Sequence, residues 1–141
     1  MKHCSQDQEH VLSVIPGIAL NPADPHSFIQ VIDGISGETD YLTYPLKAFQ
    51  WDPRNFKIQV GSSTFSLEGI SLNIKSKTIE LSGEVSYLNP VIYPGTLFSP
   101  GIMGWYSYMP FMECYHGIVS ANHILKGNLK YTQKTIDFSG G

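Results

Sequence analysis

The sequence predicts an all-β fold, either an antiparallel barrel or an open barrel or sandwich, and three observations support this. Helical periodicity is nearly absent along the chain. Short β-prone runs recur, and Gly, Pro, Asn or Asp separates each run from the next. Within many of these runs apolar and polar residues alternate, which is typical of a strand with one buried face. Because no repeat or linker interrupts the pattern, we expect residues 1–141 to form a single β domain.

The first third of the chain predicts two strands followed by a hairpin. The run HVLSVIPG (10–17) predicts a strand that Pro16 and the glycine after it end. A second strand, HSFIQVIDG (26–34), ends in an Asp-Gly turn, and Tyr41–Tyr44 return as its partner. The segment after that admits one helical turn near Leu46–Phe49 before a proline limits it.

The rest of the chain predicts a meander, a crossing segment and a final hairpin. The runs FKIQVG, STFSLEG, ISLNIKS and KTIELSGEVSY each alternate apolar with polar residues, as in an antiparallel meander. Residues 89–104 contain several prolines and glycines and predict an irregular crossing, with a short helical turn around Gly101–Ser107. Strands then return, with a hairpin turn at Thr132–Lys134.

Composition excludes several classes of protein. The formal net charge of −3 and a pI near 5.9 argue against nucleic-acid binding, which needs clustered Lys and Arg. No apolar run approaches the roughly 20 residues of a membrane-spanning helix, so we expect no integral membrane segment. The opening MKHCSQDQEH lacks the apolar region of a signal peptide. Two cysteines form no disulfide framework, so a cytoplasmic location is the simplest expectation.

The candidate metal and nucleophile residues do not form a recognisable motif. The five histidines are scattered, and only Cys114 and His116 share a strand face. Neither CxxC nor HExxH occurs, and no Gly-rich phosphate loop follows a strand, so we expect no metal and no cofactor. Without a GxSxG elbow or an orienting third group, Cys114 is best interpreted as a small buried hydrophobe and His116 as a structural residue.

The stretch GWYSYMPFMECYHG (104–117) is the strongest candidate for a functional site. A carboxyl group among aromatic rings loses hydration, which raises its pKa and lets Glu113 serve as a general acid. The alternative is a solvated Glu113 at a strand end beside an ordinary aromatic core. The prolines and glycines in and around this stretch favour the wall of an apolar pocket instead, because closely packed core strands rarely contain so many of them. Its candidate ligand-binding residues are Trp105, Tyr106, Tyr108, Phe111 and Tyr115.

At this stretch the chain resembles a known family. SPGIMGWYSYMPFMECYHGIVSANHILKGNLKYTQKTIDFSGG is similar to the central block of the bacterial tocopherol cyclase-like family. The earlier pieces VLSVIPGIAL, PHSFIQVIDG, YLTYPLKAF and FSLEGISLNI match the family pattern in the same order, so the resemblance covers nearly the whole chain. It implies a lipocalin-like architecture of two β-barrel-like halves, related to carotenoid hydratases and some pericyclases.

Two departures from the family pattern shape this expectation. Relatives carry an aromatic FEGWYFK-type strand before the position of Lys2, and they continue past DFSGG with a GYIEKDWG-type segment and a second β domain. We therefore expect an amino-terminal half, an incomplete part of a two-domain β protein. Its exposed strand edges would favour a homodimer through strand pairing.

The resemblance also implies a chemistry. Tocopherol cyclase protonates a trisubstituted alkene of a prenylated hydroquinone, and the phenol oxygen then captures the carbocation. That isomerisation needs an acid of raised pKa, an apolar pocket and aromatic faces that stabilise a cation, which Glu113 and its aromatic neighbours would supply. The expected function is binding of a hydrophobic isoprenoid-like molecule, with or without this acid-catalysed cyclisation. The alternatives are a non-catalytic lipid carrier and a purely structural or interaction domain.

Overall fold

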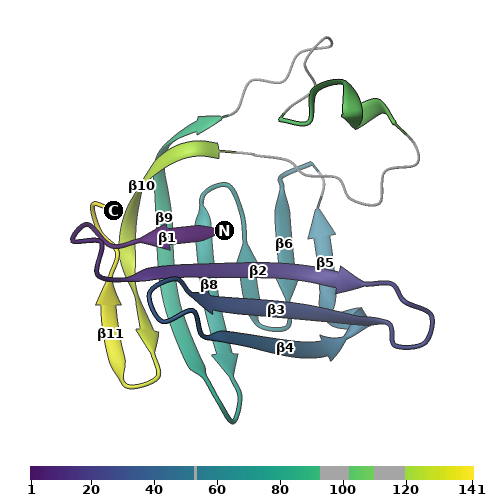
Figure 1. The fold of residues 1–141 in the computed structure, drawn as a ribbon, viewed down its shortest axis with the longest axis horizontal. Coiled ribbons are helices and arrows are strands. Elements are labelled where there is room, and N and C mark those ends of the chain that lie inside the picture. Colours follow the sequence, from purple (N-terminus) through teal and green to yellow (C-terminus); the bar gives the residue numbers. More distant parts are fainter. Residues whose placement is uncertain (53, 93–101, 110–119) are drawn as a thin grey trace. The chain divides into compact units, whose positions relative to one another are not determined.

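The structure is a computed structural model that describes residues 1–52, 54–92, 102–109 and 120–141. Over these residues it is all-β, as the sequence predicts, and contains no α-helix (Figure 1). The strands are β1 (Lys2–Cys4), β2 (Val11–Ala19), β3 (His26–Asp33), β4 (Thr39–Pro45), β5 (Phe49–Asp52), β6 (Lys57–Val60), β7 (Ser63–Phe65), β8 (Gly69–Lys75), β9 (Glu80–Ile92), β10 (Ser120–Tyr131) and β11 (Lys134–Asp137).

The contacts of the chain define two compact units. The first comprises residues 1–88 and 124–141, and the second comprises residues 89–123. Strands β9 and β10 each contribute residues to both units. The two units are described separately below.

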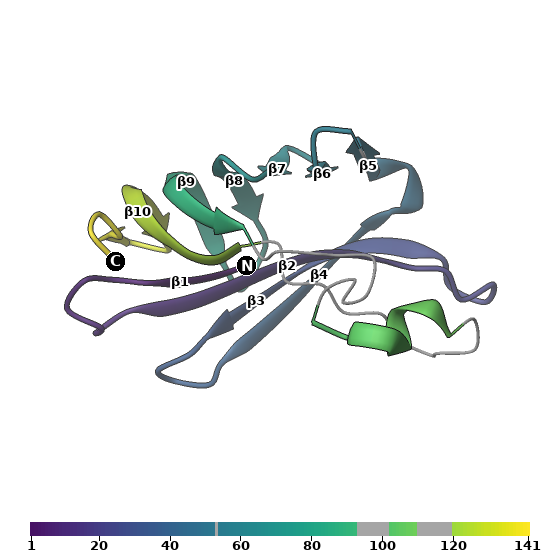
Figure 2. The same ribbon diagram turned by 90° about the horizontal axis from the view of Figure 1, so that it is seen from above.

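The first unit contains the ladders of two antiparallel sheets. Sheet A has the strand order β1-β2-β3-β4, and sheet B has the order β11-β10-β9-β8-β7-β6-β5. Figure 2 shows them as two layers. The described strands pair within these two sheets and do not close into one hydrogen-bonded barrel, so a sandwich-like arrangement is what the described residues show.

The core of this unit lies between the inner faces of the sheets and follows the period-2 alternation of the strands. In β8, for example, Ile70, Leu72 and Ile74 are buried, while Asn73 between them is exposed. Complete burial of one such side chain contributes about 1.5–3 kcal/mol. The buried apolar residues are Leu12, Val14, Ile29, Val31, Val60, Phe65, Ile70, Leu72, Ile74, Ile79, Leu81, Val85, Leu125, Leu129, Ile136 and Phe138.

The sequence prediction of a strand end at Pro16 is wrong, because β2 continues to Ala19. The backbone N–H and carbonyl of Val14 both hydrogen-bond to Met1. Every second residue of β2, counted from Val14, therefore directs its N–H and carbonyl toward the β1 side. Pro16 occupies the next such position, past the last residue of the β1 ladder. Its missing N–H therefore breaks no ladder bond, which is why proline is tolerated on an edge.

The predicted turns are confirmed where the structure describes them. A 3₁₀ turn at Leu46–Ala48 (η1) links β4 of sheet A to β5 of sheet B. A second 3₁₀ turn, Gly104–Tyr108 (η2), lies in the segment predicted to contain a short helical turn. Strands β10 and β11 form the predicted hairpin across Thr132. The predicted irregular crossing begins later than expected, because β9 extends to Ile92.

Close approach of β9 and β10 depends on two glycines. A Cβ atom on Gly127 would collide with the carbonyl oxygen of Glu84, and one on Gly83 would lie 2.5 Å from the carbonyl oxygen of Asn128. Their φ angles of +135° and +132° lie in a region that side chains rarely adopt. Only glycine therefore fits at positions 83 and 127, where these neighbouring strands approach each other closely.

Candidate functional site

Three of the predicted site residues lie in the second unit, on the 3₁₀ turn η2. Trp105 and Tyr106 are each 64% exposed and Tyr108 is 50% exposed. The other predicted site residues lie outside the described residues. They are Phe111, Glu113, Cys114, Tyr115 and His116.

Local hydrogen bonding explains why this aromatic sequence forms a turn. Gly104 has a φ angle of +53°, which glycine adopts at little cost. The backbone N–H of Tyr106 donates to the carbonyl of Met103, and the N–H of Met109 donates to the carbonyl of Tyr106. This spacing places the rings of Trp105 and Tyr108 on neighbouring turns, with centroids 6.0 Å apart and planes inclined by 54°.

The described part of the second unit exposes an unusual amount of apolar surface. Large apolar side chains in ordinary cores are buried, and contiguous exposed apolar patches often mark binding sites. Besides the three aromatic residues of η2, the exposed large apolar side chains of this unit are Val91, Ile92, Ile102 and Met109. This surface offers an apolar ligand both aliphatic contacts and aromatic faces.

A titratable group of the same unit stands near the start of β10. The ring of His123 lies 3.4 Å, Nδ1 to Oγ, from Ser120. Burial lowers the pKa of His123, because desolvation disfavours the charged imidazolium. His123 is therefore neutral at neutral pH and does not supply a proton readily.

The first unit contains a buried polar pair that the sequence pattern did not reveal. His3 of β1 is fully buried, and its Nε2 lies 2.6 Å from the hydroxyl oxygen of Tyr87 in β9. Its Nδ1 lies 3.3 Å from the carbonyl oxygen of Leu12. Because a carbonyl only accepts, Nδ1 carries the proton, and Nε2 accepts from the hydroxyl of Tyr87. The Sδ of Met1 lies 3.4 Å from the same hydroxyl.

This pair connects the two sheets, since β1 belongs to sheet A and β9 to sheet B. The rings of His3 and Tyr87 stack with centroids 5.7 Å apart, and the ring of Phe138 packs edge-on against His3. Burial raises the pKa of Tyr87 far above its ordinary value, so its phenol stays protonated. The pair is suited to holding the sheets together.

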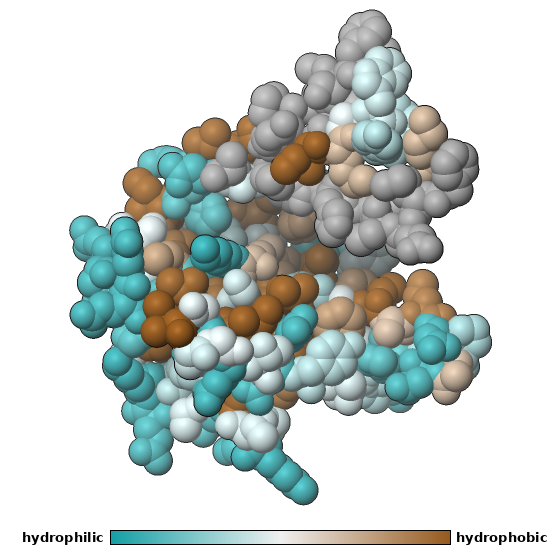
Figure 3. Space-filling view, viewed as in Figure 1, coloured by the Kyte–Doolittle hydropathy of each residue, from teal (hydrophilic) through white to brown (hydrophobic). Residues whose placement is uncertain are grey.

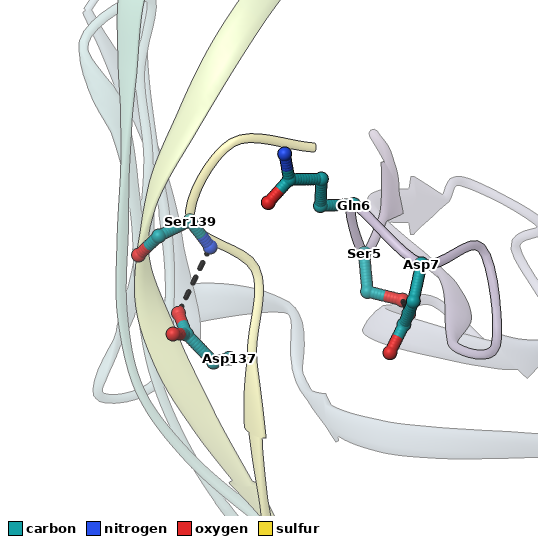
Figure 4. Close-up of a pocket in the computed structure, with 5 residues that line it drawn as sticks. All are labelled: Ser5, Gln6, Asp7, Asp137 and Ser139. Atoms are coloured by element: carbon teal, nitrogen blue, oxygen red, sulfur yellow. Dashed lines mark hydrogen bonds between the residues drawn. The ribbon is translucent and has the colours of Figure 1, made fainter.

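A polar depression lies between the loop after β1 and the end of β11 (Figure 4). It encloses about 390 Å³ and is lined by Ser5, Gln6, Asp7, Asp137 and Ser139. Hydrogen bonds lower the pKa of both carboxyl groups: Asp7 accepts from the Ser5 hydroxyl, and Asp137 accepts from the backbone N–H of Ser139. Both carboxylates are thus engaged within the loops, and we assign no ligand to this depression.

Metal-ligand clusters and membrane-spanning helices are both absent from the described residues. No group of three or more His, Cys, Asp or Glu side chains is placed to hold a metal ion in the part of the chain that the structure describes. Over the same residues, no helix has the length and apolar character required to cross a bilayer.

Comparison with known proteins adds no relative. The chain matches no protein-family model, no curated protein and no solved structure. The resemblance to the tocopherol cyclase-like family therefore stays a prediction, and the functional argument rests on the residues themselves.

Proposed function

We propose that this chain binds a hydrophobic, isoprenoid-like small molecule against the aromatic turn η2. The observation that supports the proposal is the exposure of Trp105, Tyr106 and Tyr108, together with exposed aliphatic side chains in the same unit. Burial of apolar area contributes about 25 cal/mol per Å², so such a surface favours a ligand with a long apolar chain. The aromatic faces add attraction for a cation that forms along that chain.

The proposed reaction is an isomerisation in which Glu113 donates the proton. The proton adds to a trisubstituted alkene and leaves a tertiary carbocation, which the aromatic faces stabilise. A phenol oxygen of the same molecule then forms the C–O bond and loses its own proton, which returns to the carboxylate. Atoms balance without any cofactor, so the product is an isomer of the substrate.

The binding step is tested by tryptophan fluorescence. The chain has two tryptophans, one in each unit. They are almost equally exposed, at 67% for Trp51 and 64% for Trp105. In the Trp51→Phe variant Trp105 is the only tryptophan, and excitation at the long-wavelength edge of the absorption band selects it over the tyrosines. Titration with a geranylated methylhydroquinone should change this emission with saturation. In the matched Trp105→Phe variant the emission of Trp51 should stay constant. An equal, non-saturating change in both variants would contradict the proposal.

The chemical step is tested in D₂O, where ring closure by alkene protonation places one deuterium on carbon. Glu113→Gln should lower the rate of closure by about 10²–10⁴-fold, because general acid catalysis contributes on that scale. Ligand affinity should change little, because glutamine keeps the size and polarity of the side chain. Saturable binding without any ring closure would instead support the second candidate, a non-catalytic carrier with the same apolar surface.

The proposal extends to architecture, assembly and location. We propose a lipocalin-like fold, supported by the antiparallel order of the strands, and a cytoplasmic protein, supported by the small number of cysteines. Strand β11 is an edge of sheet B among the described strands, and its outer backbone groups can pair with a second copy. Sedimentation should show a concentration-dependent dimer, and a monomer at all concentrations would argue against it.

A further inference from the structure

The outer face of strands β2, β3 and β4 in sheet A has an unusual composition. Antiparallel sheets commonly bury one face and present polar, often charged, residues on the other. Since Leu12, Val14, Ile29 and Val31 point into the core, the alternate residues of the same strands point outward. Not one of these outward residues of β2, β3 and β4 is Asp, Glu, Lys or Arg: they are Val11, Ser13, Ile15, Gly17, Ala19, His26, Phe28, Gln30, Ile32, Thr39, Tyr41, Thr43 and Pro45.

Figure 3 is drawn from the side on which these strands lie in front. Brown and pale side chains cover much of the area over β2 to β4, and the strongest teal is concentrated toward the ends of the strands. The middle of this face therefore combines apolar and weakly polar groups.

An ordered aromatic cluster lies on this face. The rings of Phe28 and Tyr41 stack with centroids 4.8 Å apart and planes inclined by only 26°. Phe28 also lies across Gly17 on the neighbouring strand, where any Cβ atom would collide with its ring. The absence of a side chain at Gly17 thus allows Phe28 to lie flat on the sheet and to support Tyr41.

A hydrogen-bonded histidine fixes the orientation of Tyr41. The Nδ1 of His26 lies 2.9 Å from the carbonyl oxygen of Asp24, so Nδ1 donates there. Its Nε2 lies within hydrogen-bond distance, 3.0 Å, of the hydroxyl oxygen of Tyr41. Although Tyr41 is held from two sides, half of its surface remains exposed, at 50%. Such preorganisation lowers the entropic cost of binding a ligand against the ring.

A groove lined by hydroxyl groups adjoins the same tyrosine. It encloses about 240 Å³ between strand β4 and the turn that joins β8 to β9. In that turn the Ser76 hydroxyl lies 3.1 Å from the Thr78 hydroxyl and accepts from the backbone N–H of Thr78, which holds both side chains in place. The polar side chains that line the groove are Tyr41, Thr43, Tyr44, Lys75, Ser76 and Thr78.

Size decides against a protein partner on this face. Three strands of about eight residues cover roughly 25 Å by 10–15 Å, given a rise of about 3.3 Å and a spacing of about 4.8 Å. The resulting area of about 250–400 Å² falls well below the roughly 800 Å² that each partner buries in a stable protein interface. It is instead typical of the functional patches of monomeric proteins.

We propose that Tyr41 and the adjoining groove bind a neutral saccharide. The C–H groups of a sugar ring carry partial positive charge and pack against the negative face of an aromatic ring. The sugar hydroxyls can exchange hydrogen bonds with Thr43, Ser76 and Thr78 in the groove. No Asp, Glu, Lys or Arg projects from the outer face of β2–β4, and Lys75 in the groove lining lies 3.9 Å, Nζ to Oε1, from Glu80. The site therefore favours a ligand without net charge. This site lies wholly in the first unit and is independent of the proposed isoprenoid site.

The test is a two-dimensional NMR titration of the whole chain with cellobiose and with lactose, each to about 50 mM, which covers the millimolar affinities of small ligands. Saturable shifts should appear at Phe28, at Tyr41–Tyr44 and at Ser76–Thr78. Vesicles of monogalactosyldiacylglycerol, compared with phosphatidylcholine vesicles, distinguish a lipid-borne sugar from a free one. Binding of either sugar form supports the proposal, and the absence of shifts at these residues with every probe would overturn it.

Four variants make the test specific. Tyr41→Ala should weaken binding at least about tenfold, whereas Tyr41→Phe, which keeps the ring, should stay within about threefold. Thr43→Val removes one hydroxyl without changing the size of the side chain and should weaken binding a few-fold. Trp51→Ala removes an exposed aromatic ring elsewhere in the same unit and should leave affinity unchanged. Equal losses for Trp51→Ala and Tyr41→Ala, or self-association through the same residues without sugar, would overturn the proposal.

Discussion

The two units of the chain place the same kinds of apolar residues in opposite environments. In residues 1–88 and 124–141, Leu, Ile, Val and Phe at alternate strand positions fill a core. In the described part of residues 89–123, Val, Ile, Met, Trp and Tyr are largely exposed. Apolar content alone therefore does not distinguish a core from an exposed surface, whereas regular alternation does.

Strand β9 shows this difference within one element. Leu81 and Val85 lie at alternate positions near its start and are buried. At Asn89 the backbone adopts a φ angle of +51°, which interrupts the alternation, and Val91 and Ile92 beyond it are exposed. The buried part stabilises the fold, and the exposed part contributes no side chain to the core.

The largest expected effect belongs to the core. Phe65→Ala removes a fully buried ring between the two sheets, so the free energy of unfolding should fall by about 3–5 kcal/mol. Urea denaturation followed by circular dichroism measures this change. A loss below about 1 kcal/mol would mean that Phe65 does not belong to a close-packed core.

Next in size is the glycine contact between β9 and β10. Gly127→Ala places a Cβ atom against the Glu84 carbonyl at a φ angle of +135°, and about 2–4 kcal/mol of stability should be lost. The matched control is Gly37→Ala, at a φ angle of +77° with open space around it, which should cost only about 1 kcal/mol. Equal shifts in melting temperature would contradict the close approach of the two strands.

A third comparison uses two Tyr–His pairs, one buried and one exposed. Tyr87→Phe removes the hydroxyl that His3 accepts from inside the protein, and this should cost about 1–3 kcal/mol. Tyr41→Phe removes the corresponding hydroxyl from His26, but this tyrosine is half exposed and the loss should cost less than about 0.5 kcal/mol. Denaturation midpoints that shift equally would show that burial of His3 has no energetic consequence.

The partly buried Tyr87 predicts a pH dependence of stability. Because the pKa of Tyr87 is raised in the folded state, the unfolded chain ionises first, near the ordinary value of 10.0. The stabilisation is complete below that pH and is lost progressively as the pH rises above it. Melting temperatures of Tyr87→Phe should therefore fall less steeply than those of the parent above about pH 10. Parallel curves would contradict the raised pKa.

The smallest effect on stability is expected for the exposed aromatic turn. Trp105→Ala should change the free energy of unfolding by less than about 0.5 kcal/mol, because the side chain is mostly exposed. The same variant should weaken binding of the geranylated hydroquinone. If it instead destabilised the protein by more than about 2 kcal/mol, Trp105 would be a core residue and not a ligand contact.

Local patterns in the sequence predicted most of the described strands and turns. A period of two residues identifies a buried strand face from residues close in sequence, as in β8, and turn residues mark where such runs end. The error at Pro16 shows the limit of this reasoning. A proline ends a strand that is paired on both sides, but it is tolerated where one side of the strand is unpaired. Whether Pro16 of β2 lies at such a place depends on how far β1 extends beside it.

Long-range pairings were not predictable in the same way. His3 and Tyr87 are 84 residues apart, and nothing in the sequence near either one indicates the other. The Phe28–Tyr41 stack likewise depends on the register of β3 with β4, since a slip of one residue would turn Tyr41 toward the core. Both pairs therefore depend on how the strands are arranged in the sheets.

By itself the sequence determined that this chain is all-β and where most of its described strands begin and end, because strand periodicity and turn chemistry act between near neighbours. Only the tertiary structure decided how the strands divide between two sheets and which apolar residues are buried. It also decided which aromatic rings lie on an outer face. These outcomes depend on contacts between residues far apart in the chain, because strands with the same alternating pattern can pair with several different partners.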